Sequence, residues 1–553
     1  MDNPNTPDKS AKKIRLPNAG TFINIYLFIM FTVFPLFVSV YTDGQFPFIH
    51  LDDGFVGIRH QKYYFFLAAT AIAVIAEIFL LISANYNGSG KPKINKKALF
   101  DSISFTDWAA LALVLSCAVS TILSPYKELA FWGESVINGS AQGRNNGLVL
   151  ILFYVIVYFM ITRLYRYSEV VFIGLACSCG IIYILTVLNG YYIDPLNMFA
   201  NFRSQQNVYM EFFATIGNKN MLSSFICITL PVLFTMSVVT QKLKFRIIYL
   251  ISVSLGAMAL IIDDSDSGLL GIAVFLAVLL VVFVRRLDRL KFYFLTLTVF
   301  LASIKVLRLI SYILEDSYKE LGELPSAVLF SNKLYIAIAV SAAITVILFW
   351  VCKDKPGLVL SKAVPITLGC IFGLAALGAL GVFVYFSFID TKTPLGDLET
   401  VLRFGPKWGT HRGVMWIHAI EIFGGADFIH KLFGFGPDTF YCVYKPYFAE
   451  LQKNFGNSYT DAAHNEYINY LVTIGIAGLG SYLAFVGGAL VRGFKSAKRN
   501  PVVLAFAAAV IGYAVQAVVN IAVPISTPLF IIFVSLCEAM ARQRETSSNV
   551  KEA

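Results

Sequence analysis

Apolar runs of about 20 residues recur along almost the whole chain, from residue 22 to residue 541. A run of that length is what one helix needs to cross the hydrocarbon core of a bilayer. Of the 553 residues, 57% are hydrophobic and only 14% are charged, and the mean hydropathy is +0.69. A soluble domain would carry about a quarter charged residues. The sequence therefore predicts an all-α, polytopic membrane protein.

The runs predict about fourteen spans. We expect a basic tail at 1–21, a transmembrane bundle at 22–390, a polar segment at 391–464, further spans at 465–541 and a second tail at 542–553. The individual spans are expected at 22–41, 63–84, 104–124, 147–165, 170–188, 220–240, 245–262, 268–284, 292–313, 334–352, 365–390, 466–491, 502–521 and 526–541.

The distribution of positive charge predicts the orientation. With the N-terminus in the cytoplasm, every short inner segment is basic, and most of the 44 Lys and Arg residues fall in inner segments. The positive-inside rule expects this pattern. The net charge of +10 therefore reports topology and not nucleic-acid binding. We expect both termini in the cytoplasm and the segment 391–464 on the outer face.

This outer segment is far longer than an ordinary connection, and such segments are usually functional or disordered. It contains Trp408 and Trp416, and its stretch "HRGVMWIHAIEIF" has apolar residues near helical spacing. That pattern predicts an ordered segment with a helix that lies along the membrane or packs under the loop. The later "FGFGPDTF" predicts a tight turn, since no strand precedes its G-x-G.

His464 closes the outer segment and is one of only six histidines. A histidine exchanges protons near neutral pH, which suits a general base at a membrane surface. Asp461 or Glu466 would orient its ring, although an aspartate at 461 also fits a helix N-cap. The alternative is an interfacial histidine without a partner.

Several cations on the predicted outer face are candidates for binding an anionic substrate. Arg412 begins the amphipathic stretch, and a planar guanidinium matches phosphate oxygens. The alternative for Arg412 is contact with lipid headgroups. Arginines on the outer face run against the positive-inside bias, which also draws attention to Arg144 and Arg203.

Three charged residues fall within predicted spans, namely Glu77, Lys305 and Arg308. Charges inside a membrane are functional candidates, so a transporter that uses them is the alternative class of function. The eight cysteines form no C-x-x-C pair, and we find no H-E-x-x-H or Walker pattern. No metal, nucleotide or other cofactor is therefore expected.

Three blocks of sequence together resemble the O-antigen ligase and O-antigen polymerase superfamily of bacterial membrane glycosyltransferases. They are "HRGVMWIHAIEIF…KLFGFGPDTF", "HNEYINYLVTIGIAGLGSYLAF" and the earlier "TIGNKNMLSSF". The resemblance covers roughly residues 100 to 540, and the block that begins at His464 is its most specific part.

The resemblance implies a GT-C type enzyme at the outer face of the bacterial cytoplasmic membrane. Such enzymes transfer a glycan from undecaprenyl diphosphate to an acceptor hydroxyl without a metal and with inversion. By position, His464 would activate the acceptor and Arg412 would bind the diphosphate. The acceptor would be a glycan, a lipid or a protein, so ligase, polymerase and protein oligosaccharyltransferase all remain open.

The chain departs from the family pattern in two places. Members often have an arginine just before the G-N-x-N segment, whereas Arg203 lies farther upstream here, so Lys219 competes with it as the second diphosphate ligand. Where members often show S-R-x near an outer span end, this chain has "SDSG" with Asp266.

Overall fold

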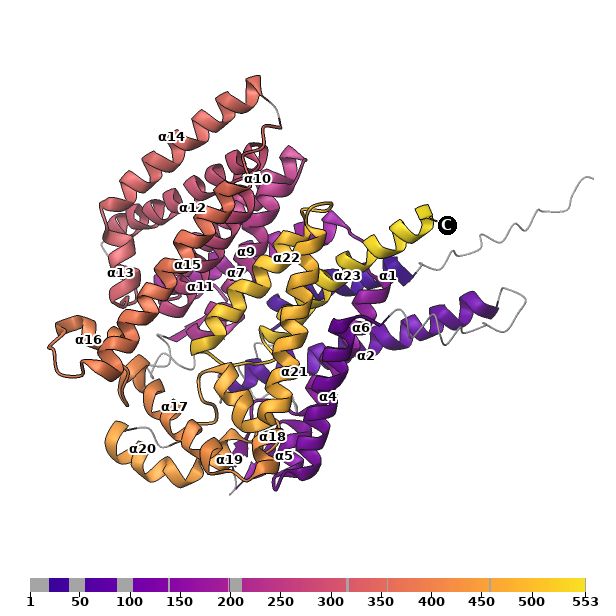
Figure 1. The fold of residues 1–553 in the computed structure, drawn as a ribbon, viewed down its shortest axis with the longest axis vertical. Helices are drawn as coiled ribbons and strands as arrows, with labels where there is room; N and C mark the ends of the chain where they lie inside the picture. Colours follow the sequence, from indigo (N-terminus) through magenta and orange to yellow (C-terminus); the bar gives the residue numbers. More distant parts are fainter. Residues whose placement is uncertain are drawn as a thin grey trace, which may run out of the picture.

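The computed structural model describes residues 19–38, 55–86, 103–137, 140–196, 198, 211–314, 318–355, 357–456 and 459–552. A helix overlaps each predicted span, and residues 39–41 of the first span lie outside the described residues. Figure 1 shows how these helices pack together. Ten helices in this part of the chain are long and apolar enough to cross a membrane, and Gly20–Leu36, Leu148–Leu164 and Val503–Val519 are shorter apolar helices. The all-α architecture with many apolar helices is therefore confirmed, and the count of fourteen spans stays a prediction. The helices that overlap the predicted spans are α1 (Ala19–Leu36), α2 (Phe55–Tyr86), α4 (Phe105–Leu123), α6 (Leu148–Leu164), α7 (Glu169–Gly190), α9 (Lys219–Val239), α10 (Leu243–Ile262), α11 (Asp266–Phe283), α12 (Leu287–Ile313), α14 (Lys333–Asp354), α15 (Ala363–Val384), α21 (Glu466–Ser496), α22 (Val503–Gln516) and α23 (Thr527–Glu552).

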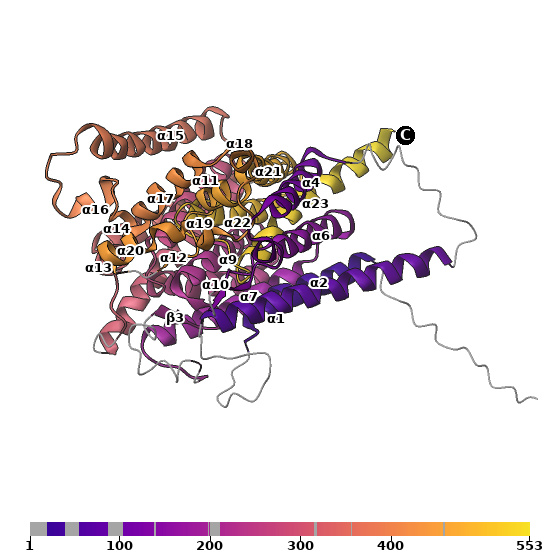
Figure 2. The ribbon, with the colours of Figure 1, turned by 90° about the horizontal axis from the view of Figure 1, so that it is seen from below.

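Helix α9 forms the centre of the bundle. Its whole apolar window is buried, and it packs against α10, α11 and α22. The close approach of α9 to α22 depends on Gly512 of α22, because a Cβ at this position would overlap the carbonyl of Cys227 on α9. At the other extreme, α15 has no buried residue and lies at the edge of the bundle (Figure 2). An apolar helix that is exposed in this way suits contact with lipid.

The two cations of α12 hold a short neighbouring helix, α13 (Glu323–Phe330). The Nζ of Lys305 donates to the carbonyl of Leu329 at 2.8 Å, and the Arg308 guanidinium lies 4.5 Å from the ring centre of Phe330. These contacts give both side chains a structural role at the α12–α13 junction.

Two short hairpins connect helices near the site. In the first, β1 (Ser135–Ile137) pairs antiparallel with β2 (Ser140–Gln142), just after α5 (Lys127–Trp132). In the second, β3 (Phe212–Phe213) pairs with β4 (Gly217–Asn218), just before α9.

The polar segment between α15 and α21 folds into short helices gathered at one end of the bundle (Figure 1). They are α16 (Glu399–Leu402), α17 (Trp408–Gly425), α18 (Phe428–Phe433), α19 (Phe440–Tyr444) and α20 (Phe448–Phe455). The predicted amphipathic helix is α17, and its Val414, Met415 and Ala419 are buried in a small core shared with α19, α20 and α21. The described residues of the segment therefore pack around a small core of their own, which includes the predicted amphipathic helix.

Helix α21 is interrupted at Gly475, and the G-x-G turn at residues 434–436 packs against the interruption. Gly475 has φ +68°, which frees carbonyls of the preceding turn. The backbone N–H groups of Phe435 and Gly436 donate to the carbonyls of Val472 and Thr473, at 3.2 and 2.8 Å. Gly434, with φ +74°, packs directly on the backbone of Thr473. Gly434 and Gly475 are thus required by close backbone contact, and backbone hydrogen bonds hold the turn against α21.

This docking predicts that Gly475→Ala destabilises the protein by about 2 kcal/mol or more, because the new Cβ would meet the carbonyl oxygen of Leu432 at a positive φ. Gly480→Ala is the matched control on the same helix, since a Cβ there meets no atom within 4 Å and alanine favours helix. Thermal unfolding of both variants in one detergent makes the comparison, and equal melting temperatures would contradict the docking.

Candidate functional site

His464 is fixed by its neighbours on both sides in the chain. The indole N–H of Trp416 donates to the carbonyl of Ala463 at 3.0 Å. On the other side, the Asn465 side chain caps α21 by accepting from the N–H groups of Tyr467 and Ile468, both at 3.0 Å. His464 itself has φ +49°, a left-handed conformation that is uncommon for a residue other than glycine. The backbone therefore holds this side chain at one place between α17 and α21.

The side chain of His464 is partly buried and lies in the field of two arginines. Burial lowers its pKa to about 3, and the positive charges of Arg144 and Arg412 contribute to the lowering. The charge of Asp461 opposes the shift but does not outweigh it. Within the described residues, no hydrogen bond engages either ring nitrogen. The ring is therefore neutral at physiological pH and has a free lone pair to accept a proton.

Asp461 pairs with Arg144 and does not cap α21. The guanidinium of Arg144 donates to the Asp461 carboxylate, and both side chains are largely buried. Burial alone would raise the pKa of Asp461, but the charge and hydrogen bond of Arg144 lower it. Asp461 is thus held as a carboxylate beside His464.

Asp438 is a site residue that the sequence did not reveal. Its carboxylate accepts from the backbone N–H groups of Arg144, at 2.6 Å, and Asn146, at 2.9 Å. Burial raises the pKa of Asp438 to about 7, although the two hydrogen bonds lower it. The available signal was an aspartate directly after the G-x-G-P turn, where short polar side chains often bind nearby backbone.

Arg412 follows a strained turn. Gly409, Thr410 and His411 all have left-handed backbone angles inside α17, and two of them are not glycine. The turn brings the carbonyl of Gly409 to 3.0 Å from Nη1 of Arg412. The Nε of Arg412 is buried and has no hydrogen-bond partner within the described residues. Burial lowers the pKa of Arg412, but a guanidinium this basic stays charged.

Gly413 is required directly after Arg412. A Cβ at this position would overlap the carbonyl oxygen of Gly405. The backbone N–H of Val414 donates to the carbonyl of Pro406 at 3.0 Å, which continues the same contact. The arginine–glycine pair thus places a cation where two backbone segments touch.

The turn between α10 and α11 brings acidic side chains towards Arg412. The charge of Asp266 acts on Arg412, and Lys219, at the start of α9, lies 3.6 Å from Asp264. Asp264 also accepts from the backbone N–H of Gly322 at 2.6 Å. Lys219 is therefore close to the site but already paired. Among the described residues, no group of three or more His, Cys, Asp or Glu side chains could hold a metal ion.

Glu466 turns away from His464 into the bundle. Its two carboxylate oxygens accept from the hydroxyls of Tyr482 and Tyr513, at 2.6 and 2.8 Å. Glu466 therefore joins α21 to α22 and does not hydrogen-bond the His464 ring. Arg203, the other predicted diphosphate ligand, lies outside the described residues.

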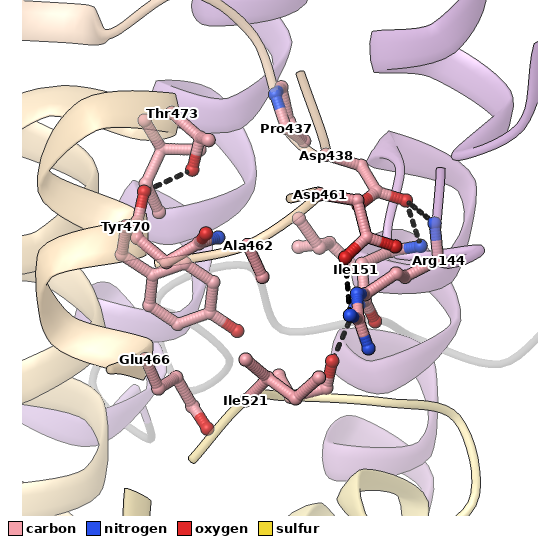
Figure 3. Close-up of a pocket in the computed structure, with 14 residues that line it drawn as sticks. Arg144, Ile151, Pro437, Asp438, Asp461, Ala462, Glu466, Tyr470, Thr473 and Ile521 are labelled. Carbon is pink, nitrogen blue, oxygen red and sulfur yellow. Dashed lines mark hydrogen bonds and ion pairs between the residues drawn. The ribbon is translucent and has the colours of Figure 1, made fainter. Parts of the chain in front are cut away.

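A partly enclosed pocket lies on the Arg144 side of the site, with about 440 Å³ of empty space that includes its mouth. Figure 3 shows Arg144 and Asp461 paired across it from Glu466 and Tyr470 on α21. His464 and Arg412 do not line this pocket. The site therefore has two sides, an Arg144 side with the pocket and an Arg412 side near the α10–α11 turn.

Residues 324–483 match the family model described as O-Antigen ligase. The resemblance to the O-antigen ligase and polymerase superfamily is confirmed. The matched segment contains Arg412, the G-x-G turn, Asp461 and His464, whereas Arg144 lies outside it. No curated protein matches the chain.

The raised pKa of Asp438 predicts a pH-dependent effect of Asp438→Asn. An acid whose pKa rises on folding, here from about 4 to about 7, destabilises the folded state increasingly as pH rises through that window. The asparagine keeps an acceptor for the two N–H groups and does not titrate. The melting temperature of Asp438→Asn relative to wild type should therefore increase between pH 4 and pH 7. A difference that does not change with pH would contradict this assignment.

Proposed function

We propose that the protein transfers a glycan from undecaprenyl diphosphate to an acceptor hydroxyl at the outer face of the bacterial cytoplasmic membrane. The observation that carries the proposal is a neutral, fixed histidine in the field of two arginines, inside a segment that matches the O-antigen ligase family. The charge pattern supports an orientation with both termini in the cytoplasm and residues 391–464 outside. The chemistry would be that of a GT-C type enzyme.

His464 is the general base in this proposal. The acceptor oxygen attacks the anomeric carbon and gives its proton to the free ring nitrogen of His464. The bond from the anomeric carbon to the diphosphate oxygen breaks, and the diphosphate leaves with the electron pair. Attack from the face opposite the leaving group inverts the anomeric centre. These steps need an oriented nucleophile and a stabilised leaving group, so neither a metal nor a nucleotide is required.

Arg412 stabilises the leaving diphosphate. Its Nε has no partner within the described residues, so a phosphate oxygen can accept from it without breaking an existing hydrogen bond. Charge on the diphosphate grows as the glycosidic bond breaks, so a fixed cation favours the transition state. The incoming phosphate competes with Asp266 for this cation. Arg203 and Lys219 remain candidates for a second phosphate contact.

Donor binding would also strengthen the base. Burial and the charges of Arg144 and Arg412 hold the pKa of His464 at about 3. A diphosphate at Arg412 offsets one of these positive charges and thereby raises the proton affinity of the ring. The ring is therefore a better proton acceptor once the donor is in place.

The acceptor class distinguishes three reactions that share this donor. A ligase would move a finished polysaccharide, a polymerase would join repeat units, and a protein oligosaccharyltransferase would modify a side chain. The alternative of a transporter rested on charges within spans. Lys305 and Arg308 make structural contacts with α13, so nothing in their surroundings favours that alternative over transfer.

We expect His464→Ala to lower kcat for glycan transfer by about a hundredfold to ten-thousandfold, since it removes the general base. Arg412→Ala should raise KM for the donor and lower kcat, because its cation acts on the leaving group in the transition state. His430→Ala is the control, since His430 lies in the same segment but pairs with Asp427 at the start of α18. Transfer from a lipid-linked donor, with protein levels in the membrane as the folding control, makes the measurement. Wild-type activity of His464→Ala would refute the mechanism.

A further inference from the structure

Three aromatic rings form a partly exposed surface on the polar segment, here called the aromatic platform, made of Tyr441, Phe448 and Tyr459. The ring centre of Tyr441 lies 5.1 Å from that of Phe448 and 6.2 Å from that of Tyr459. Tyr459 is 60% exposed, and the other two rings are partly exposed. Within the described residues, no hydrogen bond engages the hydroxyl of Tyr441 or Tyr459. The platform thus offers apolar ring surface together with two unpaired hydroxyls.

The platform rests on a rigid base. Phe440 and Tyr444, its neighbours on α19, are fully buried, and their rings stack with centres 5.4 Å apart. The hydroxyl of Tyr444 is hydrogen-bonded to Nδ1 of the buried His418 on α17, at 2.8 Å. The ring of Tyr444 also lies 6.0 Å from that of Phe448. The platform is therefore supported from below by packed side chains.

Two residues of the platform lie close in the sequence to aspartates that Arg144 holds. Tyr441 follows Asp438 by three residues, and Tyr459 precedes Asp461 by two. Asp438 and Asp461 are both held by Arg144, one through its backbone N–H and one through its guanidinium. Tyr459 lies five residues before His464, a separation that spans at most about 18 Å. A sugar residue on the platform would therefore be close enough to extend to His464.

The platform lies at one end of α20, and the other end of this helix lies near Arg412. Helix α20 reaches from Phe448, on the platform, to Phe455, whose ring is 5.0 Å from that of His411 beside Arg412. The proposed diphosphate occupies the Arg412 end. The platform, at the opposite end of α20, is thus left for the other substrate.

We propose that the aromatic platform binds the pyranose rings of a glycan acceptor. The C–H face of a pyranose packs against an aromatic ring, and the tyrosine hydroxyls can pair with sugar hydroxyls; amphipathic tyrosines make such contacts at a low cost in side-chain entropy. This inference rests on the proposed function and deepens it, because it makes the acceptor a sugar and not a protein side chain.

The test uses the full-length protein in lipid nanodiscs, the lipid-linked glycan of the source cells as donor, and oligosaccharide released from their surface glycan by mild acid as acceptor. Tyr459→Ala should raise KM for the acceptor about tenfold, which corresponds to about 1.4 kcal/mol, while kcat and KM for the donor stay within about twofold. Tyr441→Ala should act in the same direction. Tyr459→Phe keeps the ring but loses the hydroxyl, so it should raise this KM less than Tyr459→Ala does. Phe428→Ala, at a 76% exposed aromatic residue of the same segment outside the platform, should stay close to wild type.

Saturation-transfer NMR adds a readout that does not require transfer. Irradiation of aromatic protons should give signals on the acceptor's sugar protons, and these should weaken in Tyr459→Ala. Sugar signals without any wild-type transfer would reject the proposed function but support the platform. An unchanged acceptor KM in both alanine variants of an active enzyme would overturn the platform alone. Parallel increases in both KM values would also overturn it, because they would show that the rings anchor the segment to the membrane.

Discussion

Arg144 is the residue on which the geometry of the site depends. Its backbone N–H binds Asp438 and its guanidinium binds Asp461, so one residue before α6 fixes two positions of a segment some 300 residues later in the chain. Both pairs are largely buried, where breaking one partner leaves an uncompensated polar group and is costly. The hairpin and turn that precede α6 are thus as much a part of the site as the family-matched segment.

The broken helix α21 gives the same segment its second attachment. The break at Gly475 leaves carbonyls that the G-x-G turn satisfies, and Asp438 follows that turn by two residues. Backbone hydrogen bonds within a membrane must be satisfied inside the protein, so the break and the turn have to occur together. His464, just before the start of the same helix, is thereby placed relative to Asp438 and Arg144. A long apolar helix that is interrupted once can in this way position a polar site at its N-terminal end.

The helical fold followed from the sequence because long apolar runs have few alternatives to a spanning helix, and a helix overlaps each predicted run. His464 and Arg412 were recognised because a histidine and an arginine stand out in an apolar chain and match a family pattern. Asp438 was missed, since its role comes from backbone groups distant in the sequence. Glu466 is adjacent to His464 in the chain, yet helix geometry directs its side chain to Tyr482 and Tyr513. Pairings across long separations of this kind cannot be derived from spacing alone.

The most direct test of the account is the size distribution of lipid-linked and surface glycan in cells that lack this gene. If the protein transfers glycan from undecaprenyl diphosphate, the carrier should accumulate untransferred glycan, and the surface should lose the corresponding product. Long chains on the carrier would indicate a ligase, and single repeat units without long chains would indicate a polymerase. Unchanged glycan in both pools would contradict the account.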